Sequence, residues 1–303
     1  MTRQKSVALD RFVTTQLLTC GFLLLLGWSS IAAGNANETD VEIESTILSV
    51  ATPGVPEAEE AGAYADINGL KMYYEIHGAG PPLLLLHGGT SHIPERWIGF
   101  LSKSYQVIAM EQLGHGRTGD IANRPFHYHD MAEDTIELMR QLGIDRAIVV
   151  GYSDGGNIGL DMAINHPDKV SKLVVTGAQI RTDGLEPDTW KSLNSSAVEE
   201  WQAPEGYRRL SPDGADHWPV FRNRIVQMWL TEPNFTQDQV RNITAPTLVI
   251  VGDRDMITPE HAVEMFKLLP HGQLCIVPNS GHGVMPQETV LEFLAAQSSE
   301  VEN

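Results

Sequence analysis

From residue 64 onward, short apolar runs alternate with segments whose apolar positions recur at helical spacing. The first two runs, 64–67 and 70–76, flank Asn68-Gly69, the residue pair that a two-residue hairpin turn prefers. The later runs are continuously apolar, as expected of strands buried on both faces of a parallel sheet. These six runs are 83–86, 107–110, 148–150, 173–175, 248–251 and 274–277.

Helical spacing is clearest in four segments between or after these runs: 131–142, 157–166, 261–269 and 287–296. Alternation of strands and helices is typical of an α/β fold. We therefore predict a mostly parallel, doubly wound sheet of eight strands, entered by an antiparallel hairpin.

Residues 181–243 interrupt this alternation and are rich in aromatic residues. The segment suits a helical cap inserted over the C-terminal edge of the strands, where its aromatic side chains would wall a pocket. The alternative is that these side chains only form the small core of the cap itself. They are Trp190, Trp201, Trp218, Phe221, Trp229 and Phe235.

The N-terminus predicts export. Residues 1–36 combine a basic start with a mostly apolar run at 12–33 and small residues after it, which is typical of a signal peptide. An uncleaved membrane anchor is the alternative, because the run is long for a signal peptide. Both interpretations put the remaining chain outside the cytosol, in a periplasmic or extracellular location. We interpret residues 37–63 as an acidic linker, and the length of 64–302 suits one α/β domain.

Net charge limits the classes of binding partner, and cysteine content limits disulfide bonding. The formal net charge is −18, and loss of residues 1–36, which carry +2, would make it −20. A surface this acidic disfavours binding to nucleic acid and to anionic membranes, and it favours binding of neutral or cationic ligands. Cys20 lies in the export segment, so a mature chain would keep only Cys275 and would form no intrachain disulfide.

The segment Gly151-Tyr152-Ser153-Asp154-Gly155-Gly156 follows the apolar run at 147–150 and precedes a helical segment. A serine at so sharp a strand-to-helix turn adopts a strained backbone conformation that lifts its hydroxyl clear of the sheet. The flanking glycines leave room for the strand and helix to approach each other. In this context the sequence resembles the α/β-hydrolase family, with Ser153 as the nucleophile.

A serine hydroxyl needs a base within hydrogen-bond reach, itself oriented by a third group. In the α/β-hydrolase order the acid follows the serine and the histidine comes last. His282, between Gly281 and Gly283, is the only histidine after the last predicted buried strand. The acid should come from Gly252-Asp253-Arg254-Asp255. The resemblance implies Asp255, three residues after the glycine, and leaves Asp253 as a turn or helix-capping residue.

The same resemblance implies two donors for an oxyanion hole. One is the backbone N–H of Asp154, at the positive end of a helix dipole. The other is the N–H of Gly89, in the loop His87-Gly88-Gly89-Thr90. His87 and the segment 114–117 are expected to be structural. The sequence has no metal-ligand cluster, phosphate loop or dinucleotide fingerprint, so no cofactor is implied.

Asp154 directs the resemblance to one branch of the α/β-hydrolase family. Ser153-Asp154-Gly155-Gly156, with the later Thr176-Gly177-Ala178, is similar to the branch that contains valacyclovir hydrolase, an enzyme of amino-acid esters. In that branch the aspartate holds the amino group of the substrate, which implies substrate binding by Asp154. The alternative is that its carboxylate only complements the helix dipole.

The sequence therefore predicts a serine hydrolase that cleaves a small-molecule carboxylic ester, such as an aminoacyl ester, through an acyl-enzyme. An amidase or aminopeptidase and a C–C bond hydrolase would use the same residues. The alternative outside the enzymes is a protein of the same fold that binds a ligand without catalysis. Dehalogenases and epoxide hydrolases of this fold are disfavoured, because they need an aspartate at position 153.

Overall fold

The structure, a computed structural model, describes residues 62–296. The predicted signal peptide or anchor, the predicted linker up to residue 61 and the last seven residues lie outside this range. Between residues 62 and 296, no helix combines the length and apolar composition that crossing a membrane requires.

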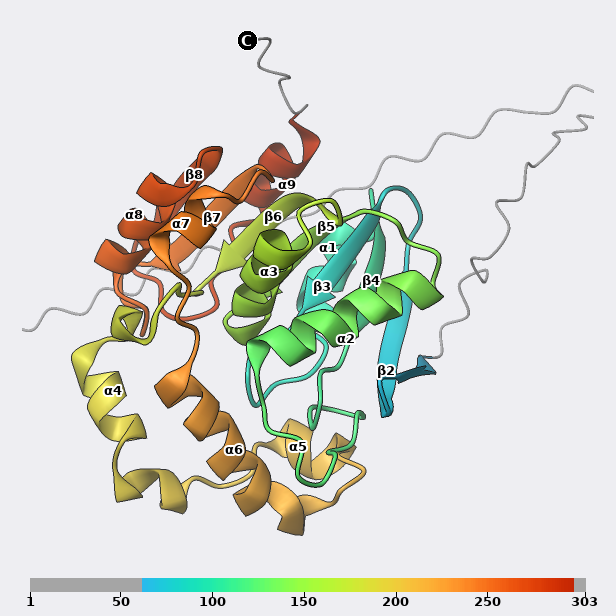
Figure 1. Ribbon diagram of the computed structural model, residues 1–303, viewed down its shortest axis with the longest axis vertical. Coiled ribbons are helices and arrows are strands. Elements are labelled where there is room, and N and C mark those ends of the chain that lie inside the picture. The colour runs from blue at the N-terminus through green and yellow to red at the C-terminus, as the bar shows by residue number, and fades with distance from the viewer. Residues whose placement is uncertain (1–61, 297–303) are drawn as a thin grey trace, which may run out of the picture. The chain divides into compact units, whose positions relative to one another are not determined.

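The described residues contain one sheet of eight strands in the order β1-β2-β4-β3-β5-β6-β7-β8 (Figure 1). β1 pairs with β2, and β2 with β4, in antiparallel fashion, while every other pairing is parallel. This confirms the predicted α/β architecture and its antiparallel hairpin, whose turn is Asn68-Gly69. The strands are β1 (Ala63–Ile67), β2 (Leu70–His77), β3 (Pro82–Leu86), β4 (Gln106–Met110), β5 (Ala147–Tyr152), β6 (Val170–Thr176), β7 (Thr247–Gly252) and β8 (Gly272–Val277).

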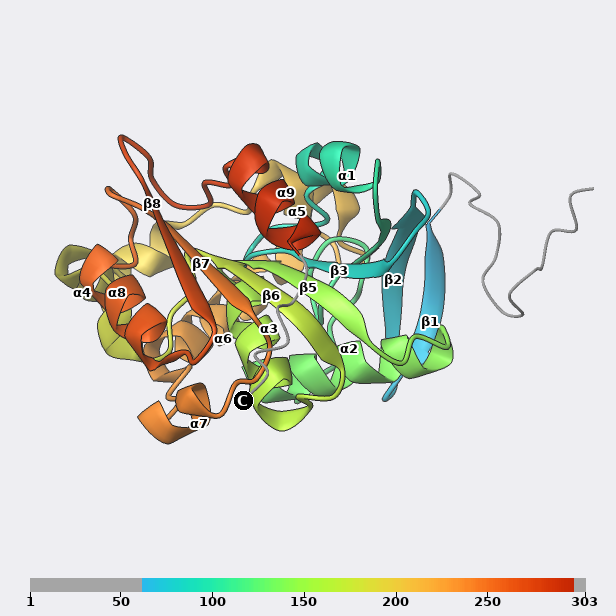
Figure 2. The same cartoon turned by 90° about the horizontal axis from the view of Figure 1, so that it is seen from above.

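Helices cover both faces of the sheet, which makes it doubly wound (Figure 2). Along β3, Leu83 and Leu85 belong to one buried cluster with residues of α1 and α9, whereas Leu84 and Leu86 belong to a second cluster with residues of α2, α3 and α8. Because successive side chains of a strand point to opposite faces, one apolar run supplies two cores. The α-helices of the described residues are α1 (Glu95–Leu101), α2 (Tyr128–Gln141), α3 (Asp154–Asn165), α4 (Pro187–Leu193), α5 (Glu205–Leu210), α6 (Trp218–Thr231), α7 (Gln237–Arg241), α8 (Pro259–Leu268) and α9 (Gln287–Ala295).

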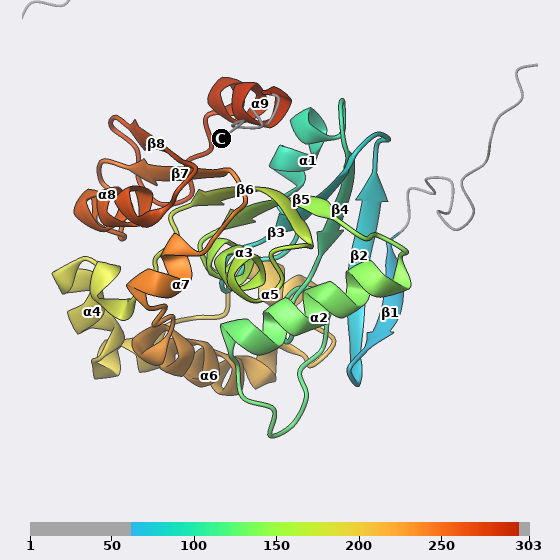
Figure 3. The same cartoon turned by 45° about the horizontal axis from the view of Figure 1, so that its top comes forward.

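One expectation about the strands is wrong. The run 274–277 lies in β8, which is at the edge of the sheet with β7 as its neighbour (Figure 3). The Ile276 side chain is 42% exposed, so this strand is not buried on both faces. An edge position explains the exposure, because no strand follows β8 on its outer side in the sheet order.

The segment between β6 and β7 is helical, and α4, α5 and α6 lie together on one side of the molecule (Figure 1). Tyr207, Trp218 and Phe221 pack ring against ring with centroids 5.1–5.6 Å apart. These aromatics form a core within the cap, and Phe221 also packs against His115 and Phe126 of the main domain, with ring centroids 4.9 and 5.5 Å away. α7, at the end of the predicted cap segment, instead contacts α8 of the main domain.

Candidate active site

Ser153 occupies the turn between β5 and α3, with φ 53° and ψ −119°. A positive φ is unfavourable for a residue with a side chain, so the predicted backbone strain is present. The turn is fixed by a hydrogen bond from Ser153 N to Thr176 O of 2.9 Å. A Cβ at Gly155 would lie 2.4 Å from Leu86 O, which explains why glycine follows the turn.

Three side chains that are distant in sequence form one hydrogen-bonded chain at this turn. Ser153 Oγ lies 2.9 Å from His282 Nε2, and His282 Nδ1 lies 2.6 Å from Asp255 Oδ1. Asp255 is 5% exposed, and its Oδ1 also accepts a hydrogen bond of 3.0 Å from Ile257 N. A histidine whose Nδ1–H donates to a carboxylate presents Nε2 as an acceptor to the hydroxyl. The arrangement can therefore take a proton from Ser153.

Asp253, the other candidate acid, has a different position. Its Oδ1 accepts a hydrogen bond of 3.1 Å from Ser280 N, and Arg254 N donates to Ser280 O at 3.0 Å. Backbone N–H groups of Asn279 and Ser280 lower the pKa of Asp253. Asp253 thus joins two loops, the one after β7 and the one that carries His282. These contacts agree with the turn role predicted for Asp253.

The His282 ring packs closely against its surroundings. A Cβ at Gly177 would lie 2.8 Å from His282 Cε1, so a larger residue there would displace the ring. The Tyr152 ring lies 5.1 Å from the His282 ring, centroid to centroid. These contacts limit the rotation of the imidazole and hold Nε2 toward Ser153.

Ser153 and His282 open onto a cavity of about 390 Å³. Much of its wall is apolar and comes from the cap and from the loop after β7, while Gly89, Asp154 and Gln179 add polar groups. None of the described residues that line it is a lysine or an arginine. The apolar lining residues include Leu185, Leu193, Trp201, Trp229, Met256 and Ile257. The pocket-wall interpretation therefore holds for Trp201 and Trp229, and the cap-core interpretation holds for Trp218.

The two predicted oxyanion-hole residues lie side by side in this cavity wall. A Cβ at Gly89 would lie 2.4 Å from Asp154 Oδ2 and 2.5 Å from Trp229 Cζ2. Asp154 is the first residue of α3, so its N–H has no acceptor within the helix. The two backbone positions are thus close to Ser153 and to each other.

The loop that carries Gly89 is fixed by His87. Gln112 N donates a hydrogen bond of 3.0 Å to His87 Nε2, and His87 Nδ1 lies 2.8 Å from Gly88 O. Burial lowers the pKa of His87 to about 4, so the ring is neutral and its Nδ1–H donates to the Gly88 carbonyl. The expected structural role of His87 agrees with these contacts.

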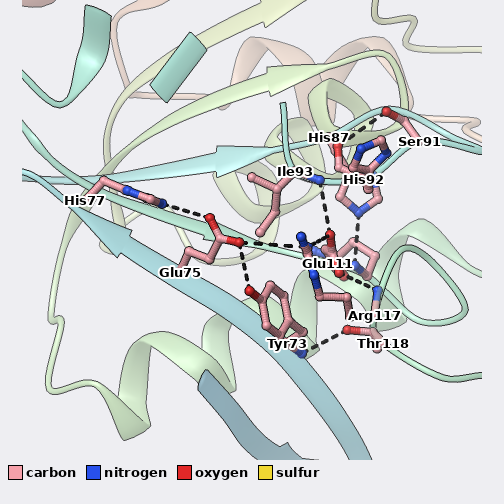
Figure 4. Close-up of polar contacts among 11 residues, drawn as sticks. Tyr73, Glu75, His77, His87, Ser91, His92, Ile93, Glu111, Arg117 and Thr118 are labelled. Atoms are coloured by element: carbon pink, nitrogen blue, oxygen red, sulfur yellow. Dashed lines mark hydrogen bonds and ion pairs between the residues drawn. The ribbon is translucent and has the colours of Figure 1, made fainter. Parts of the chain in front are cut away.

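A buried polar network supports the same loop (Figure 4). The Glu111 carboxylate, 0% exposed, accepts hydrogen bonds from Arg117 N at 2.5 Å, Arg117 Nη1 at 2.7 Å and Ile93 N at 3.4 Å. Arg117 also lies 3.8 Å from Glu75, which pairs with His77 at 2.8 Å. The network joins the turn at 114–117 to the loop after β3, in agreement with a structural role for that turn.

The Asp154 carboxylate has contacts that the sequence did not indicate. Its Oδ1 accepts a hydrogen bond of 2.9 Å from Tyr128 OH, and Trp229 Nε1 lies 2.9 Å from both carboxylate oxygens. The side chain is 6% exposed, and burial raises its pKa to about 6 although both hydrogen bonds lower it. Tyr128 and Trp229 are 26 and 75 residues away in sequence, which is why no local pattern points to them.

Outside this site, His129 and Glu232 form hydrogen bonds with other residues of the main domain and the cap. His129 lies within α2, where its Nδ1 is 3.0 Å from Asp161 Oδ1. Glu232 accepts a hydrogen bond of 3.0 Å from Tyr128 N at the start of α2. In the part of the chain that the structure describes, no three His, Cys, Asp or Glu side chains are grouped to hold a metal ion.

A doubly wound sheet with a serine at the β5–α3 turn and a helical cap defines the protein as an α/β hydrolase. The chain belongs to the α/β hydrolase family, whose model matches residues 83–297. Hydrolysis is thus its class of activity.

Curated relatives carry the name putative carbamate hydrolase RutD. The protein from Caulobacter segnis is 37% identical over 250 residues, which cover 73% of this chain and 94% of that protein. The protein from Caulobacter sp. (strain K31) is 29% identical over 270 residues, which cover 75% of this chain and 97% of that protein.

Solved structures share the fold at lower identity. The meta-cleavage product hydrolase CumD from Pseudomonas fluorescens IP01 superposes with a TM-score of 0.63 at 22% identity, covering 77% of this chain and 97% of that chain. A serine hydrolase involved in carbazole degradation, CarC, superposes with a TM-score of 0.64 at 22% identity, and the match covers 78% of this chain and 99% of that chain.

Proposed function

We propose that this protein is a serine hydrolase that cleaves carboxylic esters through an acyl-enzyme. The observation that carries the proposal is the hydrogen-bonded chain from Ser153 through His282 to Asp255, which opens onto the cavity. A serine, a base and an orienting carboxylate in this geometry are the parts that nucleophilic catalysis at a carbonyl requires.

In the proposed reaction, Ser153 Oγ attacks the ester carbonyl carbon while His282 Nε2 accepts the hydroxyl proton. Asp255 holds the imidazole in orientation and stabilises its positive charge. The backbone N–H groups of Gly89 and Asp154 donate to the oxyanion. The C–O bond then breaks, the alcohol leaves with the proton from His282, and water hydrolyses the acyl-serine by the same steps.

The cavity favours neutral or cationic substrates. Its lining includes the Asp154 carboxylate and no described lysine or arginine that would hold an anionic substrate group. An aminoacyl ester would place a cationic amino group near Asp154, whose Oδ2 accepts only the shared indole N–H. A buried pairing of this kind is stronger than one in water.

Carbamate esters are the second candidate substrate. The observation that favours them is the name of the relatives, putative carbamate hydrolase, at 37% identity over most of both chains. Attack by Ser153 on a carbamate carbonyl would give a carbamoyl-serine and needs no further residue. The N-terminal sequence adds the proposal that the enzyme works outside the cytosol, as a secreted or membrane-anchored protein.

The test is a substrate panel on the purified full chain and on Ser153→Ala. The panel contains p-nitrophenyl acetate and butyrate, p-nitrophenyl carbamate, alanine ethyl ester and alanine p-nitroanilide. We expect ester hydrolysis that Ser153→Ala abolishes, with circular dichroism unchanged. Turnover of the anilide alone would favour an amidase. Hydrolysis retained in Ser153→Ala, or no turnover of any substrate, would overturn the proposal.

A further inference from the structure

The loop after β3 carries the proposed oxyanion donor Gly89 and is attached at both ends to two consecutive residues, Glu111 and Gln112. At its start, His87 Nε2 accepts a hydrogen bond of 3.0 Å from Gln112 N. At its end, Ile93 N donates one of 3.4 Å to Glu111 Oε1 (Figure 4). Glu111 and Gln112 directly follow β4, the parallel neighbour of β3, so the end of one strand holds the loop that leaves the other.

The tip of this loop has open space next to it. Gly89 and Thr90 line the catalytic cavity and also a second hollow of about 540 Å³, whose wall includes Pro204 and Gly206 of the cap. Thr90 has φ 56°, a left-handed conformation that is unfavourable for a β-branched residue. A strained residue keeps such a conformation only where its surroundings hold it. Because side chains fill only part of the space around the tip, the attachments at the loop ends fix where Gly89 lies.

Glu111 is placed to hold the loop, and its burial is unfavourable. Its side chain is 0% exposed and accepts three hydrogen bonds, one from Ile93 N and two from Arg117, through N at 2.5 Å and Nη1 at 2.7 Å. Burial raises the pKa of Glu111 although its contacts with Arg117 lower it, so desolvation disfavours the charged form that binds these donors. A buried ion pair adds little net stability compared with apolar residues of similar shape. Fold stability alone therefore does not account for a carboxylate at this position.

We propose that Glu111 is a positioning residue, which holds the loop after β3 so that the Gly89 N–H points toward the oxyanion. The inference rests on the proposed function, because it uses Gly89 as an oxyanion donor. An oxyanion donor acts mainly in the transition state. A displaced loop should therefore lower kcat and leave KM nearly unchanged.

The experiment compares two Glu111 variants with a matched control, Asp134→Asn. Asp134 is also a carboxylate with 0% side-chain exposure, with Arg124 Nη2 at 2.7 Å and a pKa raised by burial. It accepts hydrogen bonds from Asn68 and Arg124, which lie outside the loop after β3. Glu111→Gln removes the charge and leaves one oxygen for three donors. Glu111→Asp keeps the charge but shortens the side chain, so that the 3.4 Å contact with Ile93 N is lost.

Steady-state kinetics on p-nitrophenyl butyrate are measured below the melting temperature of every variant, and circular dichroism checks the fold. We expect both Glu111 variants to lower kcat by about 10-fold or more with KM within about threefold of wild type, since loss of a whole oxyanion donor costs about 10²–10³ in kcat. Asp134→Asn should lower the melting temperature but keep kcat within about threefold of wild type.

If Glu111→Gln does not fold, Glu111→Asp, which keeps a carboxylate opposite Arg117, decides the question. A kcat at the wild-type value in Glu111→Asp, or an equal loss of kcat in Asp134→Asn, would overturn the inference.

A second readout, calorimetric binding of butylboronic acid, does not depend on turnover. Its boron accepts the Ser153 oxygen, the hydroxyl proton passes to His282, and one boron-bound oxygen of the tetrahedral adduct takes the position of the oxyanion. We expect its dissociation constant to rise in the Glu111 variants by about the factor by which kcat falls, and to stay at the wild-type value in Asp134→Asn. An unchanged dissociation constant in the Glu111 variants would overturn the inference. Failure of the proposed function is distinguishable, because it appears as ester hydrolysis that does not require Ser153, whatever the Glu111 variants do.

Discussion

Trp229 Nε1 lies 2.9 Å from both carboxylate oxygens of Asp154, the residue that follows Ser153. Trp229 belongs to α6 of the cap, and Asp154 begins α3 of the main domain. The bond joins the cap directly to the turn that carries the serine. A displacement of α6 would therefore act on the backbone N–H of Asp154, one of the two proposed oxyanion donors.

The buried Asp154 carboxylate makes stability depend on pH. Its pKa rises from 3.8 to about 6 on folding, mainly because of burial. Between these values the native state holds a proton that the unfolded state has lost, so the free energy of unfolding decreases as pH rises toward about 6 and stays reduced above it. Asp154→Asn removes this penalty. We expect the variant to be more stable than wild type by about 1–3 kcal/mol near pH ~7.5 and equally stable near pH ~4.

Urea unfolding of both proteins at the two pH values measures this difference. The asparagine side chain keeps an oxygen that accepts from Trp229, so the comparison changes the charge and leaves the shape alone. A stability difference that is the same at both pH values would contradict the assignment of the titration to Asp154.

Asp154 also gives a prediction about substrates. If its carboxylate pairs with a substrate amino group, wild type should prefer alanine ethyl ester over N-acetylalanine ethyl ester in kcat/KM by about 10-fold or more. Asp154→Asn should remove the preference while the acetylated ester is still hydrolysed. Equal values for the two esters on wild type would leave Asp154 with its helix-dipole and cap-binding contacts only.

The choice of acid is tested by two matched substitutions. Asp255→Asn should lower kcat by about 10³-fold or more, because the carboxylate that orients His282 is lost. Asp253→Asn should leave kcat within about threefold of wild type, because Asp253 contacts the Ser280 backbone and not the imidazole. Steady-state kinetics on one ester decides between them, and the reverse order of effects would exclude Asp255 as the orienting acid.

The sequence predicted those parts of the protein whose cause is local. The eight strands follow from apolar runs, and the positive φ of Ser153 follows from a glycine-flanked turn between strand and helix. His282 and Asp255 were identified by their position after particular strands, and they meet because parallel strands end at one edge of the sheet.

Contacts between distant segments could not be predicted in this way. The Asp154 carboxylate binds side chains 26 and 75 residues away, and no periodicity encodes that pairing. The exposure of Ile276 depends on the strand order, which an apolar run does not reveal.

The central claim, that Ser153 is a nucleophile activated by His282, is tested most directly by covalent labelling. The purified full chain is treated with a fluorophosphonate, and the modified residue is located by peptide mass spectrometry. We predict a single adduct on Ser153, no adduct in Ser153→Ala, and labelling slowed by about 10⁴-fold or more in His282→Ala, because the two residues act as a unit. An unlabelled wild-type protein, or labelling that persists in Ser153→Ala, would contradict the account.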